Sequence, residues 1–280
     1  MPEPTAAPLD RVLVLEPRPG PPRAWMADVW AHRAVFLMLA RKDFQTRYKR
    51  AAFGVLWAVA VPVLQGVVMA AVFSQIIPRS STGINFGAYV FGGVLAFSYF
   101  GTTLTAGVTA IVDGSSLTDK VWFPRVLLVL VPAVANLVSL GVSMVVLLFV
   151  LPVLGVDLST RLLLLGPAMV LLVLFSMALT LVVSALQVYY RDTRFLVQAA
   201  MLVWIYLTPV LYTRDLLGRF ADWVDLNPLT GIVALIHRAT VGGSEALLRP
   251  VTISVAMTVM LTLIGFEAQR RHDRLFVDLL

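Results

Sequence analysis

The sequence contains no cysteine, and charged residues make up only 14% of the chain. The absence of cysteine excludes disulfide bonds and thiolate metal sites. Because a soluble domain carries about 25% charged residues, the low charge indicates that a bilayer surrounds most of this chain. The basic excess is therefore expected to set membrane topology and to meet anionic lipid, not nucleic acid. The three histidines lie far apart in the sequence, which argues against a local metal motif: His32, His237 and His272.

Asp, Glu, Lys, Arg and His are also absent from six long apolar runs. A helix needs about 20 apolar residues to cross a ~30 Å hydrocarbon core, and five of the runs meet that length or nearly so. Backbone groups in lipid must be satisfied internally, so the runs predict helices. We expect an all-α integral membrane protein with six transmembrane helices. The runs are 51–78, 87–112, 126–151, 162–190, 195–213 and, the shortest, 250–266.

The basic residues predict the orientation of these helices. With six spans both termini share one side, which then holds sixteen Lys and Arg residues against six on the other side. The positive-inside rule places the side with sixteen, and so both termini, in the cytoplasm. On the other side, residues 226–243 contain an apolar patch of about ten residues, too short to span, which predicts a re-entrant or interfacial segment.

We divide the chain into four parts: a proline-rich tail expected to be disordered (1–24), an amphipathic interface helix (25–50), the transmembrane domain (51–268) and a cytoplasmic C-terminal tail (269–280). In the second part, large apolar residues fall near one helical face and basic residues lie elsewhere, which is typical of a helix in the membrane interface. The alternative is an ordinary amphipathic helix that packs on the protein.

No acid–base pair, nucleophile triad or phosphate-binding loop of the G-x-x-x-x-G-K-[ST] type is visible. Carriers coupled to protons or ions keep ionisable groups in their spans, and these spans have none. The chain is therefore expected to be no enzyme and to hold no cofactor, and any transport needs energy from a partner. The loop 113–125 predicts a small helix on the membrane surface, or a plain connection with a tryptophan anchor.

Four patches occur in order: "RYKRAAFGVLWAVAVPVLQ" from Arg47, "DKVWFPRVLL" from Asp119, "YYRDTRFLVQ" with "WIYLTPVLY" from Tyr189, and "NPLTGIVALIHR" from Asn227. Together they resemble the membrane subunit of ABC-2-type polysaccharide exporters, the O-antigen, teichoic-acid and capsule permeases. The resemblance covers roughly residues 33–276.

This resemblance implies a type V-like ABC exporter fold in the bacterial cytoplasmic membrane. It implies a homodimer with two copies of a separate ATPase subunit, which bind ATP and Mg, and a glycan cargo on a polyprenyl-pyrophosphate carrier. The segment 113–123 would couple to the ATPase, and 216–240 would form short re-entrant outer helices. The coupling residues are Asp113, Ser116, Asp119, Lys120, Trp122 and Phe123, and the outer ones are Asn227, Pro228 and Arg238.

Two further groups of residues are candidates for binding the cargo. A basic cluster precedes the first span and either sets topology alone or also binds the carrier headgroup, since arginine binds phosphate bidentately. Aromatic residues of the second and fifth spans either line the glycan conduit or belong to the aromatic belt at the membrane interface. The cluster is Arg41, Lys42, Arg47, Lys49 and Arg50, and the aromatics are Tyr89, Phe97, Tyr99, Phe100, Trp204, Tyr206 and Tyr212.

The predicted function is export of a lipid-linked polysaccharide. An ABC-2 permease for small lipophilic drugs is the nearest alternative. A membrane-embedded glycosyltransferase should show acidic residues at the membrane surface arranged for a metal and a nucleotide sugar, and no convincing set is visible. A non-transporting assembly scaffold would not depend on an ATPase.

Overall fold

A computed structural model describes residues 21–49, 52–76, 84–118, 122–243 and 247–272, and all regular structure within these ranges is helical. The all-α prediction is therefore confirmed for the described residues. The predicted disordered tail lies outside them up to residue 20, and a helix already begins at Pro22. Of the C-terminal tail, residues 273–280 lie outside them.

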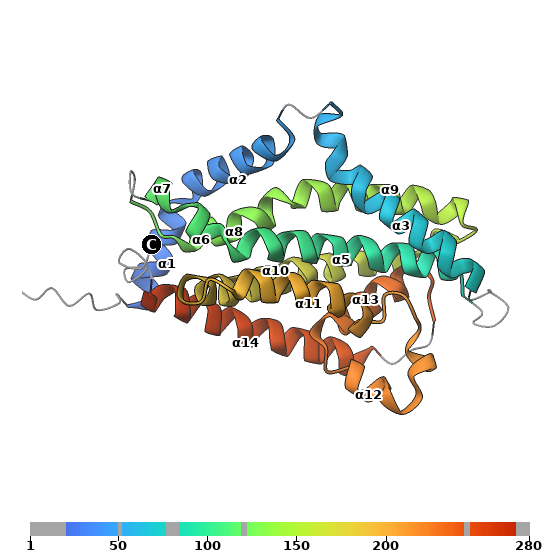
Figure 1. Cartoon of the computed structure of the whole chain (residues 1–280). Coiled ribbons are helices and arrows are strands. Elements are labelled where there is room, and N and C mark those ends of the chain that lie inside the picture. Colours follow the sequence, from blue (N-terminus) through green and yellow to red (C-terminus); the bar gives the residue numbers. More distant parts are fainter. Residues whose placement is uncertain (1–20, 50–51, 77–83, 119–121, 244–246, 273–280) are drawn as a thin grey trace, which may run out of the picture.

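The long helices run side by side and are joined by short helical turns (Figure 1). In chain order the elements are α1 (Pro22–Ala31), α2 (Arg33–Tyr48), η1 (Gly54–Leu56), α3 (Trp57–Ile76), α5 (Phe86–Val108), α6 (Ala110–Asp113), α7 (Ser115–Thr118), α8 (Val126–Ala135), α9 (Leu137–Val153), η2 (Thr160–Leu164), α10 (Leu165–Tyr189), α11 (Thr193–Leu207), η3 (Arg214–Phe220), α12 (Ala221–Val224), α13 (Pro228–Thr240) and α14 (Leu248–His272).

Within the described residues, five stretches of helix are long and apolar enough to cross a membrane: Trp57–Ile76, Phe86–Val108, Val126–Val153, Thr160–Tyr189 and Leu248–Arg271. The run expected to be the shortest, 250–266, lies inside the 25-residue helix α14. The short helix is instead α11, whose 15 residues reach about 22 Å at 1.5 Å per residue. Five of the six predicted spans are confirmed by length and composition. The predicted span 195–213, which contains α11, is not.

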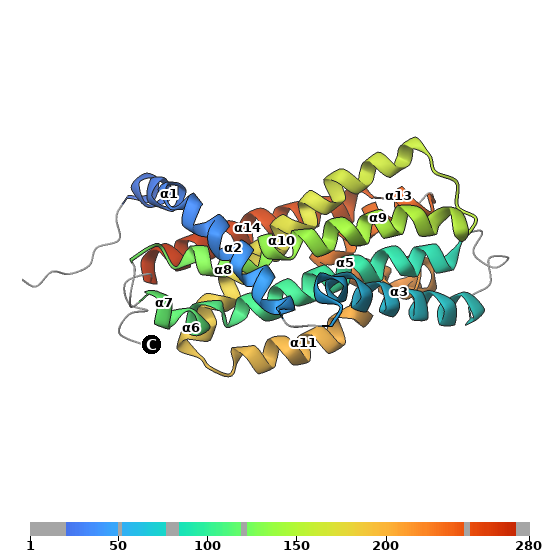
Figure 2. The same ribbon diagram turned by 90° about the horizontal axis from the view of Figure 1, so that it is seen from above.

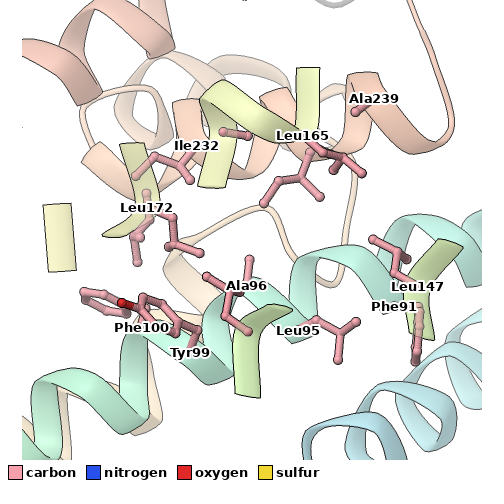
Figure 3. Packing of buried hydrophobic residues seen from close by; sticks show 14 of the residues in the cluster. Phe91, Leu95, Ala96, Tyr99, Phe100, Leu147, Leu165, Leu172, Ile232 and Ala239 are labelled. Atoms are coloured by element: carbon pink, nitrogen blue, oxygen red, sulfur yellow. The ribbon is translucent and has the colours of Figure 1, made fainter. Parts of the chain in front are cut away.

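α5 forms the centre of the bundle. Two-thirds of its most apolar window is buried, against 17% for α3 and α14. Its Phe100 stacks on Phe175 of α10 with ring centroids 5.6 Å apart, and Phe91 and Leu95 belong to the same hydrophobic core (Figure 3). Gly107 lets α5 approach α10, because a Cβ there would lie 2.0 Å from Cγ2 of Thr180. The small residue thus sets the spacing of two long helices.

The predicted interface helix is divided into α1 and α2 at His32. The His32 ring nitrogen Nδ1 lies 2.9 Å from the carbonyl of Asp28, and the backbone at His32 leaves the helical region. α2 then runs obliquely to the long helices (Figure 2). Its Leu39 and Ala40 are buried in contact with the bundle, whereas Leu37 is 60% exposed. The segment therefore packs on the protein with one face, and its place at a membrane interface stays a prediction.

The described ends of the chain meet at one end of the bundle (Figure 1). Trp25 of α1 makes an edge-to-face contact with Phe266 of α14, with ring centroids 5.8 Å apart. We name this end, which also carries α6 and α7, the termini end. The other end, with η3, α12 and the start of α14, is the far end. The side of the membrane on which each end lies stays a prediction.

Candidate functional site

Arg47 occupies the last turn of α2, which starts at the termini end and runs toward the middle of the bundle (Figures 1 and 2). Its guanidinium pairs with Asp43 one turn earlier, at 2.7 Å from Nη2 to Oδ2. The other nitrogen, Nη1, donates a hydrogen bond of 3.0 Å to Oδ1 of Asn136. The side chain is 27% exposed, so this cation is held by two partners while part of it stays accessible.

Asn136 lies between α8 and α9, at the point where the third long stretch of helix is interrupted. The amide accepts from Arg47 and donates a 3.1 Å hydrogen bond to the hydroxyl of Thr103 on α5. Both Asn136 and Thr103 are buried. A polar chain therefore runs from the surface helix α2 through a helix break to the centre of the bundle.

Two cavities share Arg47. One, of about 440 Å³, lies among α2, α5, α6 and α8, and Lys42, Asp43 and Asp113 belong to its wall. The other, of about 300 Å³, lies among α3, α5 and α9, and among the described residues Arg47 is the one charged residue in its lining. Both volumes fall within the roughly 300–1,000 Å³ typical of small-molecule sites.

The structure brings part of the predicted basic cluster together. Lys42 and Arg47 border the same cavity. Arg41 and Lys49 are exposed and are not part of either cavity wall. Arg50 lies outside the described residues. The charged surface that could receive an anion is therefore centred on the last two turns of α2.

Among the predicted aromatics, several are built into the core of a single chain. Tyr89 stacks on His237 with ring centroids 3.4 Å apart, and its hydroxyl donates to the carbonyls of Pro209 and Tyr212, both at 3.0 Å. The Tyr99 hydroxyl donates to the carbonyl of Ala133. Tyr89 is 2% exposed and Tyr99 is 4% exposed, so within one chain these rings face protein.

The other predicted aromatics are graded in exposure. Phe100 is fully buried and lies between Phe97 and Trp204, with centroid distances of 5.9 and 5.3 Å. Phe97, Trp204 and Tyr212 are partly buried, and Tyr206 is 64% exposed. Of the seven, Tyr206 thus presents the most open ring.

Asn227 fixes the turn after α11 to the start of α13. Its Oδ1 accepts from Nε1 of Trp204 and from the amide of Leu229, both at 3.1 Å. Its Nδ2 donates to the carbonyl of Leu207 at 3.1 Å and to the Thr208 hydroxyl at 2.9 Å. Pro228 begins α13, and Arg238 near its end is partly buried. The predicted short helices after residue 216 are present, whereas their re-entry into a membrane stays a prediction.

The far end carries an ion-pair cluster that sequence reasoning missed. Arg214 pairs with the buried Asp225 at 2.6 Å, and Arg249 pairs with Asp222 at 2.6 Å. Longer contacts of 3.8 and 3.9 Å cross-link the two pairs. The cluster ties η3 and α12 to the first turn of α14. The signal in the sequence is weak, because the partners are separated by 8 to 27 positions.

The comparison with protein families decides what kind of membrane protein carries this arrangement. Residues 34–237 match the ABC-2 type transporter family, which is most of the chain. The chain belongs to this family.

Three curated relatives are permeases. The O-antigen export system permease protein RfbA of Myxococcus xanthus is 27% identical over 256 residues, covering 88% of this chain and 96% of the relative. Two such permeases of Klebsiella pneumoniae are 23% and 22% identical, over 71% and 88% of this chain and over 77% and 95% of the relatives. The ABC-2 fold described above therefore corresponds to almost the whole of two of the three relatives.

In this ABC-2 permease the predicted coupling segment forms two four-residue helices at the termini end. Asp113 and Ser116 are exposed, and Asp119 and Lys120 lie outside the described residues. Trp122 is 70% exposed and contacts the His32 ring edge-to-face at 5.8 Å, whereas Phe123 is buried. The exposed side chains are available to a partner, and Phe123 anchors the segment to the bundle.

Proposed function

We propose that this chain is the membrane subunit of an ATP-driven exporter for a polyprenyl-pyrophosphate-linked polysaccharide. The observation that carries the proposal is the alignment with O-antigen export permeases over up to 96% of their length. The same alignments cover 88% of this chain, so the similarity is not limited to one shared segment.

The composition of the helices supports the need for a partner. α3, α5, α8, α9 and α10 contain no Asp, Glu, Lys, Arg or His, so they offer no group for ion coupling. A hydroxyl-rich glycan cannot cross bare hydrocarbon, where unpaired polar groups cost several kcal/mol each. Few helices in one copy are available to enclose it, so we propose a homodimer in which each copy binds one ATPase subunit.

In this proposal the carrier headgroup binds at the termini end. Lys42 and Arg47 border a cavity, and Arg41, Lys49 and Arg50 add positive charge nearby in the sequence. Arginine forms strong, bidentate contacts with phosphate. Both termini then face the cytoplasm, where the headgroup is available and where the coupling segment with Trp122 meets the ATPase.

The glycan conduit is proposed to use aromatic surfaces, which stack on the apolar faces of sugars without fixing them by hydrogen bonds. Tyr206 and Trp204 on α11 are the first candidates because their rings are exposed or partly exposed. Tyr89, Tyr99 and Phe100, which are buried in one chain, would instead support the shape of the wall.

The test is reconstitution of the chain with its co-expressed ATPase in proteoliposomes. ATP hydrolysis by the complex should rise when a polyprenyl-pyrophosphate-linked glycan is added. ATP hydrolysis by the ATPase alone should not respond to the glycan. Stimulation by small lipophilic drugs, with no response to the glycolipid, would assign the chain to drug export instead. Transport by the chain without ATPase would contradict the proposal.

A further inference from the structure

The cavity among α3, α5 and α9 differs in chemistry from a third cavity, which lies on another side of α9. Seven of its thirteen lining residues carry polar side chains. This third cavity, of about 570 Å³ between α9 and the η2–α10 segment, has two polar residues among its ten lining residues. A cavity filled only by lipid chains needs no polar wall, so the α3–α5–α9 cavity is suited to a different ligand.

Two rows of hydroxyl groups give this wall its polarity. Ser98 and Thr102 lie one turn apart on α5, and Ser139 and Ser143 lie one turn apart on α9. Residues four apart share a helix face, so each pair is directed to the same cavity.

The hydrogen bonds of these hydroxyls leave acceptor capacity. The Thr102 hydroxyl donates to the carbonyls of Ser98 and Tyr99, at 2.8 and 3.1 Å, and the Ser139 hydroxyl donates to the carbonyl of Ala58. A hydroxyl that donates its one hydrogen to the backbone keeps lone pairs that accept from a ligand. The wall is therefore matched to a neutral ligand rich in O–H donors.

The mouth of the cavity adds an aromatic ring and a cation. Trp57, 46% exposed at the start of α3, belongs to the wall. Arg47 belongs both to this wall and to that of the neighbouring cavity, which also contains Lys42. The groups thus follow an order in space: cations first, then an aromatic ring with hydroxyls.

We propose that the α3–α5–α9 cavity is a sugar-binding subsite for the part of the cargo next to its pyrophosphate. Arg47 contacts the pyrophosphate, the first sugar stacks on Trp57, and its hydroxyls donate to the serine and threonine oxygens. Asn136 keeps Arg47 at the mouth through their 3.0 Å hydrogen bond. This inference rests on the proposed function, since it names the part of the cargo that the cavity recognises.

The experiment measures binding to the complex of this chain with its ATPase in lipid nanodiscs. Two probes are compared: polyprenyl pyrophosphate that carries a saccharide repeat, and sugar-free polyprenyl pyrophosphate. Wild type should bind the sugar-bearing probe about tenfold more tightly, because stacking and a few hydrogen bonds together contribute that much. Ser98→Leu, which fills the cavity, should remove this preference and leave the Kd of the sugar-free probe unchanged.

The matched control is Ser159→Leu, which places the same side chain in the wall of the apolar cavity. It should keep the tenfold preference. An unchanged preference in Ser98→Leu, or an equal loss of affinity for both probes, would overturn the subsite.

A second pair of variants decides the matter if Ser98→Leu does not assemble. Trp57→Ala should lose most of the preference for sugar, and Trp57→Phe, which keeps an aromatic face, should retain it. If wild type, Trp57→Ala and Trp57→Phe all show the same preference for the sugar-bearing probe, the inference is overturned. Failure of wild type to bind either probe would instead reject the proposed function itself.

Discussion

Two charged clusters of the bundle hold their charges in different ways. In the far-end cluster, two arginines face two aspartates, and the buried Asp225 lies within 4 Å of both Arg214 and Arg249. In the cluster on α2, Arg47 pairs with one carboxylate and one neutral amide, and two cavities open beside it. Charge is neutralised internally in the first cluster, whereas Lys42 and Arg47 of the second border a cavity that could receive an anion.

This difference separates stability from binding. An internally paired charge stabilises the fold only as long as its partner is present. A partly satisfied cation beside a cavity contributes less to the fold and can exchange a protein partner for a ligand. Variants in the far-end cluster should therefore change stability, and variants at Arg47 should mainly change function.

The largest effect is expected from Arg214→Ala. It leaves the buried Asp225 carboxylate without its 2.6 Å partner, which should lower the free energy of unfolding by about 3 kcal/mol. Thermal unfolding of the purified complex measures this loss. Arg219→Ala, an exposed change in the same short helix, is the control and should shift the midpoint little. Equal midpoints in the two variants would show that the far-end cluster does not stabilise the fold.

Arg47→Glu should reverse the pattern, with a smaller loss of stability than Arg214→Ala and about a tenfold weaker response of ATP hydrolysis to the glycolipid. The reason is that the change places a negative charge where the phosphate is proposed to bind. Arg33→Glu makes the same change of charge on α2 at an exposed site that borders neither cavity. If both variants respond like wild type, the cluster serves topology alone.

Tyr206→Ala should reduce glycan export about threefold to tenfold without changing assembly, because it removes an exposed ring that is proposed to contact the cargo. Export is followed by detection of glycan at the cell surface. Trp223→Ala removes another exposed aromatic, 73% accessible on α12, and should leave export unchanged. Similar losses in both variants would assign the effect to the membrane interface rather than to a conduit.

Asn227→Ala should cost about 1 kcal/mol, since it removes the N-cap of α13 and the hydrogen bond to Trp204. Thermal unfolding in detergent detects the change. Asn227→Asp keeps the oxygen that accepts from Trp204 and Leu229, so it should lose less. A larger loss in the aspartate variant would argue that the amide donors to Leu207 and Thr208 dominate.

The smallest effect concerns pH. Burial raises the pKa of Asp225, and Arg214 and Arg249 oppose the rise. A folded-state pKa above the unfolded value means that the folded chain binds the proton more tightly. The stability that this proton binding contributes is fully present below the pKa of Asp225 in the unfolded chain. It is lost as pH rises through the pKa of Asp225 in the folded chain. Relative to Asp225→Asn, wild type should therefore be more stable near pH 4 than near pH 7. An equal difference at both values would contradict the assignment.

Features that depend on residues close together in the sequence can be predicted from it. Apolar length identifies five long helices, because a bilayer requires each helix to satisfy its own backbone. The same reasoning fails at α11, where the run 195–213 is interrupted at Thr208 and Pro209 and the backbone leaves the helix. Nothing in apolar composition distinguishes this interruption from the tolerated Pro62 or Pro132 inside α3 and α8.

The candidate site was predictable only in part. Positive charge before the first span identified Arg47 and Lys42, but not the amide of Asn136, 89 positions away, that holds Arg47. The hydroxyls of Ser98 and Ser139 look unremarkable in an apolar run, since their significance depends on two helices meeting. The break at His32, where the ring contacts the Asp28 carbonyl, is likewise not visible in the helical periodicity of the sequence.

The shortness of α11 has a consequence for the surrounding lipid. After Leu207 the chain turns, and its carbonyls are met by Asn227 and Tyr89 instead of by the next helical turn. As a membrane span, a segment of about 22 Å would leave a mismatch of several Å in a hydrocarbon layer of ~30 Å. The bilayer would then thin locally, or the neighbouring short helices would cover the difference. Transport should consequently depend on acyl-chain length, and α11 is where a thicker membrane acts first.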